Sequence, residues 1–326
     1  MSVINVKERI NRAEPYVALQ MEQTRPPLRS LNVRELLELE IPPREMILNP
    51  ILPAQGLVML YAPRGIGKTH VALWMAYTIA CGGEMFGNKW QCEKPYKVLF
   101  VDGEMPASTL QMRLSSIVAS SERELEDVDN LKIITPDYQE KGIPDLSILS
   151  GQEWLEPHLE GINLLILDNL SALCRSGREN ESESWNPLQG WLLKLRRKGI
   201  SVLFVHHAGK GGDQRGTSKK EDILDTVIVL RKPNDYDPKE GARFVVYYEK
   251  ARGFYGDEAK SFEAWLKGEN GKMTWQVQEM EDLQLNSLIE LYKDGLKQRE
   301  IAQELGLGLG TVNRWIKRAK EEGKVE

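Results

Sequence analysis

The stretch LVMLYAPRGIGKT, residues 57–69, decides the fold of this chain. Its apolar first half predicts a buried parallel strand, and residues 70–76, HVALWMA, have the apolar spacing of a helix. A glycine-bearing loop joins the two and ends in Gly67-Lys68-Thr69. In a strand–loop–helix unit of this kind, backbone N–H groups converge on one point, and the positive end of the helix also attracts anions there. The stretch therefore predicts a phosphate-binding loop.

The residue types of this loop suit a bound triphosphate. Lys68 can reach the β- and γ-phosphates, and the Thr69 hydroxyl can bind Mg²⁺. Alanine replaces the first glycine of the strict motif at Ala62, but Gly65 and Gly67 remain where the backbone must come closest to the ligand. The alternative is a glycine-rich turn without a ligand. We expect nucleotide contacts from Ala62, Pro63, Arg64, Gly65, Ile66, Gly67, Lys68, Thr69 and His70.

Length and composition fit one large domain and one small one. The chain has 326 residues, of which 41% are hydrophobic, and a formal net charge of −5, which argues neither for nor against nucleic acid. No apolar run approaches the ~20 residues of a membrane span, and the first residues do not resemble a signal peptide. We therefore expect a cytoplasmic protein without a membrane partner. Cys81, Cys92 and Cys174 have no paired spacing and predict ordinary thiols.

Strand and helix patterns alternate from Ile51 to about Glu279, which predicts a wound α/β domain with a largely parallel sheet. Expected strands are 57–61, 97–102, 131–135, 163–168 and 201–206, and helices are expected at 106–120 and 185–197. Strands 226–230, 243–249 and 273–277 are expected to form an antiparallel edge. Before this domain we predict an N-terminal arm, residues 1–45, with a short helix within 31–39; it packs on the core or a neighbour, or is a partly ordered lead-in.

Three later strands end in polar residues, which should gather with the loop because ligands lie beyond the carboxyl ends of parallel strands. Asp168 ends an apolar strand, as does the acid that holds Mg²⁺ in phosphate-loop NTPases, and it shares this predicted metal role with Thr69. Hydrolysis also needs a base for the attacking water, which Asn169 cannot be. Glu104 is the candidate base, and Asp102 is the second choice.

Further candidates for phosphate contact follow the last strands. His206 and His207 end one strand, where a histidine can hydrogen-bond the γ-phosphate; two histidines at the rim of the core are the alternative. The loop after them, residues 208–220, carries four cations and suits a nucleic-acid backbone or a neighbour's nucleotide. Lys250 and Arg252 are two residues apart on an extended segment, so both can point at one phosphate, which can belong to a neighbouring subunit.

The order of these motifs resembles the RecA-type ATPases, and within them the RepA-like hexameric replicative helicases of plasmids and mobile elements. The resemblance covers roughly residues 30–280. It implies a RecA-like fold and a ring, usually of six subunits, with ATP between subunits and single-stranded DNA in the channel. It also implies that Glu104 is the catalytic carboxylate, His206 or His207 the γ-phosphate sensor, and Arg215 the finger reaching a neighbour's site. Lys250 and Arg252 resemble the Lys-x-Arg pair of DnaB-type helicases, so the identity of the finger stays open.

The C-terminal residues 281–326 predict a small all-α domain beside the core of residues 46–280. Three helices are expected, around 285–292, 298–305 and 311–320, with Thr311 as the cap of the third. This pattern resembles the helix-turn-helix of resolvases and sigma-like factors, whose last helix enters the major groove of duplex DNA. Expected base contacts come from Thr311, Asn313 and Arg314, and backbone contacts from Lys317 and Lys320. A protein-binding three-helix module is the alternative. The expected apolar seam is Ile301, Ala302, Leu305, Val312 and Ile316.

Three functions are compatible with these features. The first is a DNA motor, using ATP and Mg²⁺, that serves replication of a plasmid or mobile element. The second is an ATP-switched DNA-binding regulator or loader that separates no strands. The third, a RecA-like recombinase, is disfavoured because no polymerisation strand is evident before the core.

Overall fold

The computed structural model describes residues 28–176, 182–208, 222–233, 235–269, 271–321 and 324–325. The chain divides into two units, Met1–Pro43 and Arg44–Glu326. In the described part of the first unit, helix α3 (Val33–Leu37) confirms the short helix expected there. A capping box begins it, because the Asn32 side chain accepts a hydrogen bond from the Glu35 N–H while the Glu35 carboxylate accepts one from the Asn32 N–H.

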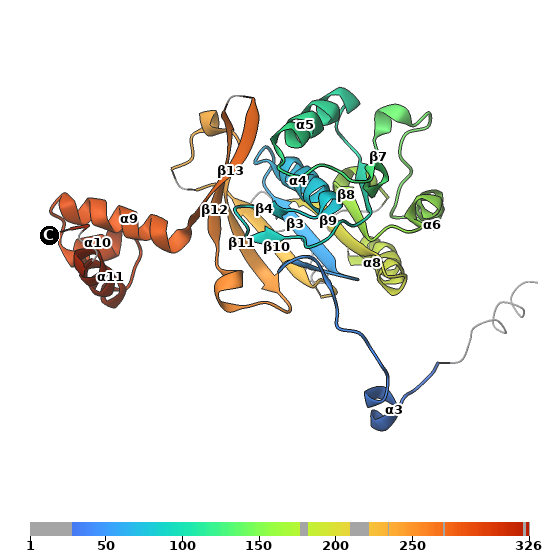
Figure 1. Cartoon of the computed structure of the whole chain (residues 1–326), viewed down its shortest axis with the longest axis horizontal. Helices are drawn as coiled ribbons and strands as arrows, with labels where there is room; N and C mark the ends of the chain where they lie inside the picture. The colour runs from blue at the N-terminus through green and yellow to red at the C-terminus, as the bar shows by residue number, and fades with distance from the viewer. Residues whose placement is uncertain are drawn as a thin grey trace, which may run out of the picture. The chain divides into compact units, whose positions relative to one another are not determined.

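The second unit contains the sheets and the other helices of the described residues (Figure 1). Its strands are β1 (Met46–Leu48), β2 (Leu52–Pro53), β3 (Leu57–Ala62), β4 (Glu84–Met85), β5 (Trp90–Gln91), β6 (Val98–Asp102), β7 (Leu131–Ile134), β8 (Leu164–Asp168), β9 (Ser201–His207), β10 (Thr226–Arg231), β11 (Arg243–Ala251), β12 (Phe262–Glu269) and β13 (Lys272–Glu279). Its α-helices are α4 (Lys68–Cys81), α5 (Ala107–Ser120), α6 (Leu149–Leu155), α7 (Leu170–Leu173), α8 (Ser182–Arg197), α9 (Met280–Lys293), α10 (Gln298–Glu304) and α11 (Leu309–Glu321).

The main sheet has nine strands in the order β13-β12-β11-β10-β3-β9-β8-β6-β7. All neighbours from β10 to β7 pair in parallel, and β10 to β13 pair antiparallel. This topology confirms a mostly parallel α/β sheet with an antiparallel edge. β10 joins the two parts of the sheet: it pairs antiparallel with β11, as expected, and parallel with β3. No strand was predicted at β12, which pairs with both β11 and β13.

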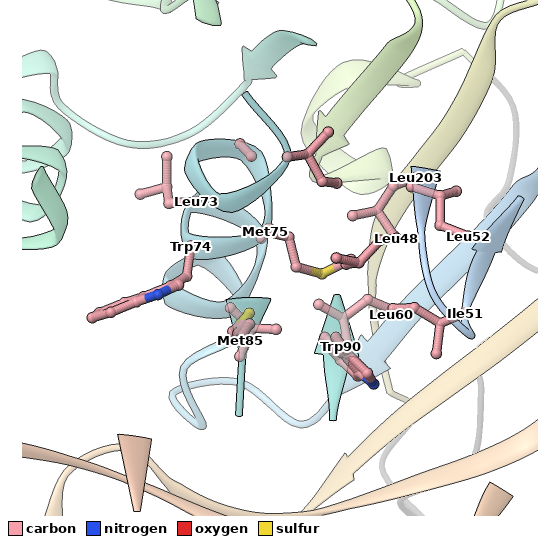
Figure 2. Close-up of a cluster of buried hydrophobic side chains, with 14 of the residues drawn as sticks. Leu48, Ile51, Leu52, Leu60, Leu73, Trp74, Met75, Met85, Trp90 and Leu203 are labelled. Carbon is pink, nitrogen blue, oxygen red and sulfur yellow. The ribbon is translucent and has the colours of Figure 1, made fainter. Parts of the chain in front are cut away.

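Helices cover both faces of the sheet because its central strands are apolar on both faces. Val58, Leu60 and Ala62 of β3 belong to one buried cluster with α4, and Leu57 and Met59 belong to a second cluster with α8. Figure 1 shows α4 and α8 on opposite sides of these strands. In Figure 2, Met75 points from α4 toward Leu48 and Leu203, while Trp74 leaves another side of the helix. Burial on all sides explains why α4 is apolar nearly throughout.

The C-terminal helices α9, α10 and α11 enclose a hydrophobic cluster of their own. Ile301, Val312 and Ile316 are buried in it as expected, and Ala302 and Leu305 pack against it partly buried. Trp315 was not predicted to be buried, but it lies in the same cluster and is 7% exposed. Thr311 was wrongly expected to cap the last helix. That helix begins two residues earlier, at Leu309, and the Gly308 carbonyl accepts the Thr311 and Val312 N–H groups. No helix in the described ranges has the length and apolarity to cross a membrane.

Asp225 holds together the amino end of the parallel strands. It is 3% exposed, and its carboxylate accepts hydrogen bonds from the Leu57 N–H at 2.9 Å and from Arg44 Nη1 at 2.9 Å. Arg196 of α8 lies 3.5 Å from the same carboxylate. Burial by itself would raise the pKa of Asp225, but these donors lower it below its ordinary value. Asp225 therefore fixes the start of β10 to β3, to α8 and to the segment before β1.

We predict that Asp225→Asn lowers the free energy of unfolding by about 1–3 kcal/mol at pH 7, because it removes a buried charge that its partners stabilise. A carboxyl with a lowered folded-state pKa stabilises above its unfolded pKa and loses that contribution as the pH falls. The difference from the parent should therefore shrink below about pH 4. Urea titrations at several pH values measure it. Glu45→Gln, which removes an exposed ion pair with Lys94, is the control and should change nothing measurable.

Candidate functional site

The loop between β3 and α4 has the backbone of a phosphate-binding loop. Gly65 and Gly67 have φ values of +77° and +109°, which side chains other than glycine rarely adopt. A Cβ on Gly67 would also lie 3.2 Å from the Cβ of Ala242, a tight contact that a larger residue could make only if Ala242 moved. Ala62 is fully buried in β3 and pairs with His207 of β9, so the alanine that departs from the strict motif fits without strain.

Lys68 is the first residue of α4 and is folded back over its own loop. It is 6% exposed, and its Nζ donates to the Ala62 and Pro63 carbonyls at 2.9 and 2.8 Å. Burial lowers the pKa of Lys68 to about 8, although the charges of Asp168 and Glu104 oppose this shift. The ammonium is thus held near the loop N–H groups, where it can exchange carbonyl partners for phosphate oxygens.

Asp168 lies beside this loop at the end of β8. It is 3% exposed, and burial raises its pKa to about 6, against the effects of a hydrogen bond from Thr69 and the charge of Lys68. Its Oδ2 is buried and accepts no hydrogen bond from the described residues. A free carboxylate oxygen next to a threonine hydroxyl is the donor set that a hard cation such as Mg²⁺ takes. These two residues therefore fit the predicted metal role.

Glu104 lies near Lys68 and Asp168 but, unlike them, is exposed to solvent. It follows β6, which pairs in register with β8 so that Asp102 lies opposite Asp168. The Glu104 side chain is 66% exposed. Asn169 Nδ2 donates to its Oε2 at 2.5 Å, and His207 Nε2 lies 3.9 Å from the same oxygen. A carboxylate is therefore presented to solvent beside Lys68 and Asp168, as a base for an attacking water requires.

Asp102, the second choice for the base, has a different environment. It is 2% exposed, and its Oδ2 accepts a hydrogen bond from the Met105 N–H at 2.8 Å. Burial raises the pKa of Asp102 to about 7, and the neighbouring charge of Asp168 adds to the shift. Asp102 thus closes the turn that carries Glu104, and its geometry suits a structural role better than contact with a substrate.

The three histidines near the loop differ in placement. His207 pairs with Ala62, so it lies on the α4 face with the loop, and it approaches Glu104. His206 is 2% exposed and, because side chains alternate along a strand, points to the opposite face. The structure therefore brings His207, and not His206, to the site. His70, in the first turn of α4, has its pKa lowered to about 4 by burial and by the charge of Arg113, so it is neutral at pH 7.

Two residues near this site were not among the predicted site residues. Asn169 was rejected as a base, but its hydrogen bond to Glu104 is one of the shortest contacts in the site. Arg113, on α5, is near enough for its charge to lower the pKa of both His70 and Asp168. A polar residue after an acid-ended strand could have pointed to Asn169. No signal in the sequence singles out Arg113, because only the packing of α5 on α4 brings it there.

Lys250 and Arg252 lie away from this chain's own loop. Lys250 pairs with Val227 at the start of β10, hence at the amino end of the parallel strands, while the loop follows their carboxyl end. Both side chains turn toward one atom, as their spacing predicted: Lys250 Nζ and Arg252 Nη2 donate to the Asp222 carbonyl at 3.5 and 3.0 Å. Arg215 lies outside the described residues.

The C-terminal helices present a basic surface. Asn313, Arg314, Lys317 and Lys320 of α11 are exposed, and Thr311 is half-buried in its first turn. The opposite side of α11 carries the buried Val312, Trp315, Ile316 and Ala319. The helix is thus clearly amphipathic, and its solvent face carries the cations.

Comparison with known proteins agrees with this geometry. A family model described as AAA domain matches residues 22–213, which is more than half of the chain. The chain belongs to the AAA domain family. A second family model, described as homeodomain-like domain, matches residues 287–326. Among solved structures, a KaiC-like protein from the hyperthermophilic archaeon Pyrococcus horikoshii OT3 is similar at 17% sequence identity and a TM-score of 0.49, over 72% of this chain and 96% of that protein. On the two family matches, the protein is an AAA-type P-loop ATPase with a C-terminal helix-turn-helix region.

We predict that Asp102→Asn makes the nucleotide-free protein more stable above pH 7, by about 1–4 kcal/mol. A carboxyl whose folded-state pKa is raised contributes stability at low pH and loses it as the pH rises through the folded value of about 7. The advantage of the variant should therefore be absent near pH 4, grow up to pH 7 and then level off. Asparagine keeps an oxygen for the Met105 N–H. The measurement is the free energy of unfolding of both proteins across this pH range. A difference between them that does not change with pH would contradict the raised pKa of Asp102.

Proposed function

We propose that this AAA-type ATPase is a ring-forming DNA motor, a helicase or translocase, that acts in replication of a plasmid or mobile element. The observation that carries the proposal is the convergence of Lys68, Asp168 and Glu104 at one rim of the sheet in a chain that also has a helix-turn-helix region. A nucleotide-driven motor needs both a hydrolytic site and a DNA contact. We propose residues 46–280 as the ATPase core and 281–326 as the DNA-binding domain.

The proposed chemistry follows from the positions of the side chains. The loop N–H groups and Lys68 bind the β- and γ-phosphates of ATP. Thr69 and Asp168 hold Mg²⁺, which, when bound, neutralises phosphate charge and aligns the transferred group. Glu104 orients the attacking water and takes its proton through a carboxylate that faces solvent. His207, next to Glu104, is placed to contact the γ-phosphate and to respond to its loss.

Assembly into a ring is supported by the position of Lys250 and Arg252. Both residues lie at the amino end of the parallel strands, so they cannot reach the phosphate loop of their own chain. Cations that stabilise transferring phosphate charge are often supplied by a neighbouring molecule. We propose that one or both act on the nucleotide of the next subunit, as the resemblance to hexameric helicases implies; Arg215 stays a further candidate.

DNA contact is proposed at two places. Duplex DNA would bind the exposed face of α11, with Thr311, Asn313 and Arg314 toward the bases and Lys317 and Lys320 toward the phosphates. Single-stranded DNA would pass through the channel of the ring, as in the helicases that the sequence resembles. Such phosphate contacts would make binding strongly dependent on salt.

A regulator or loader that ATP switches, without unwinding, is the second candidate. The match to a homeodomain-like domain favours it, because recognition of a duplex site needs no strand separation. Hydrolysis would then be slow and insensitive to DNA. Strand separation that depends on Lys68 supports the motor, whereas sequence-specific duplex binding without it supports the regulator.

Our first functional prediction concerns turnover. Lys68→Ala should abolish ATP binding, whereas Glu104→Gln should keep binding and lower kcat by about 10²–10⁴-fold, because only the base is lost. The measurement is ATPase rate with no DNA, with single-stranded DNA and with duplex DNA, together with the mass of the assembly. A parent-like rate in both variants would exclude hydrolysis at this site. Lys141→Ala, an exposed substitution outside the site, is the control.

The second concerns action between subunits. Arg252→Ala and Glu104→Gln proteins should each be nearly inactive alone, but mixing them should restore part of the ATPase rate. Some mixed interfaces then combine the intact Glu104 of one subunit with the intact Arg252 of the other. The control is the double variant mixed with either single variant, because no interface in those mixtures combines an intact Glu104 with an intact Arg252. Unchanged activity on mixing, with both variants folded and assembled, would contradict a role of Arg252 in trans.

A further inference from the structure

Asn169 makes two hydrogen bonds with its side chain, one at each end of the amide. Its Oδ1 accepts the Ala172 N–H at 3.2 Å and so caps α7. Its Nδ2 donates to Glu104 Oε2 at 2.5 Å. Asn169 itself is 4% exposed, directly follows β8 and is fixed on both sides. A fixed amide therefore hydrogen-bonds a functional side chain that is itself largely exposed.

Glu104 needs such a partner. Its side chain is 66% exposed and sits on a turn, where a free carboxylate would visit several rotamers. Both contacts described for its carboxylate, from Asn169 Nδ2 and from His207 Nε2, involve Oε2. None of the described residues donates a hydrogen bond to Oε1 of this exposed carboxylate. The arrangement holds one oxygen in place and leaves the other to accept a proton from water.

We propose that Asn169 is a positioning residue that sets the Glu104 carboxylate for attack on the γ-phosphate. The inference rests on the proposed function, in which Glu104 is the base. An amide suits the task because it donates a hydrogen bond without carrying charge or competing as a base. Misplacing a reacting group by about 1 Å can cost about 100-fold in rate, so the contact should appear in turnover rather than in nucleotide binding.

The test separates the two hydrogen bonds of Asn169. Serine is a good helix cap, so Asn169→Ser keeps α7 but is too short to reach Glu104. Asn169→Asp also caps, but it places a negative charge against Glu104. The matched control is Asn163→Ser. The Asn163 Oδ1 accepts a hydrogen bond from the Lys97 N–H at the amino end of the same strands, away from the site. For each protein one measures kcat and KM for ATP, the Kd of a non-hydrolysable ATP analogue, and the melting temperature.

We expect Asn169→Ser to lower kcat by about 10–100-fold, with the Kd within about twofold of the parent and an unchanged melting temperature. Asn169→Asp should lower kcat further, and Asn163→Ser should leave kcat as in the parent. A parent-like kcat in Asn169→Ser, with Glu104→Gln inactive, overturns the positioning role and leaves the proposed function standing. A rise in Kd or a fall in melting temperature large enough to account for the lower kcat also overturns the positioning role. If Glu104→Gln is as active as the parent, the proposed function itself fails.

Discussion

Parallel pairing of β3, β9, β8 and β6 is the constraint on which the rest of the structure depends. Parallel strands end at a common edge, so the residues that follow each strand meet there whatever their distance in the sequence. Ala62 pairs with His207, and Asp102 pairs with Asp168. The order of strands also matters. β9 lies between the loop strand β3 and the acid strand β8, which places His207 between the phosphate loop and the acidic groups.

Buried ionisable groups at the two ends of these strands have pKa values shifted in opposite senses, toward the charged form at one end and toward the neutral form at the other. At the amino end, the donors around Asp225 lower its pKa, so the charged form stabilises the fold. At the carboxyl end, burial shifts the pKa of Lys68 to about 8, of Asp168 to about 6 and of Asp102 to about 7, each toward the neutral form. Charges held there reduce stability, since each loses hydration without a full set of partners. Such a cost is expected where groups are preorganised for a charged ligand.

The antiparallel strands add a second consequence. Because β11 is antiparallel to β10, Lys250 and Arg252 lie at the amino end of the parallel strands, and the phosphate-binding loop follows their carboxyl end. A single chain therefore carries the phosphate-binding loop at one end of the parallel strands and a pair of cations at the other. In the ring that we propose, these two ends meet between neighbouring subunits, and we propose that the helix-turn-helix region binds duplex DNA.

The sequence by itself determined the local features of this protein. The glycines of residues 62–69 permit the positive φ values of a phosphate-binding loop. Apolar runs ending in Asp102, Asp168 and His207 predicted strands, and the basic face of α11 followed from helical spacing. These signals are local because they depend on backbone sterics and side-chain periodicity. Only the tertiary structure decided the parallel direction of β10, the strand β12, and the choice between His206 and His207. It also decided the contact of Asn169 with Glu104 and the approach of Arg113. Each of these depends on which strands or helices become neighbours, and that choice is made by the packing of the whole sheet, which no short stretch of the chain encodes.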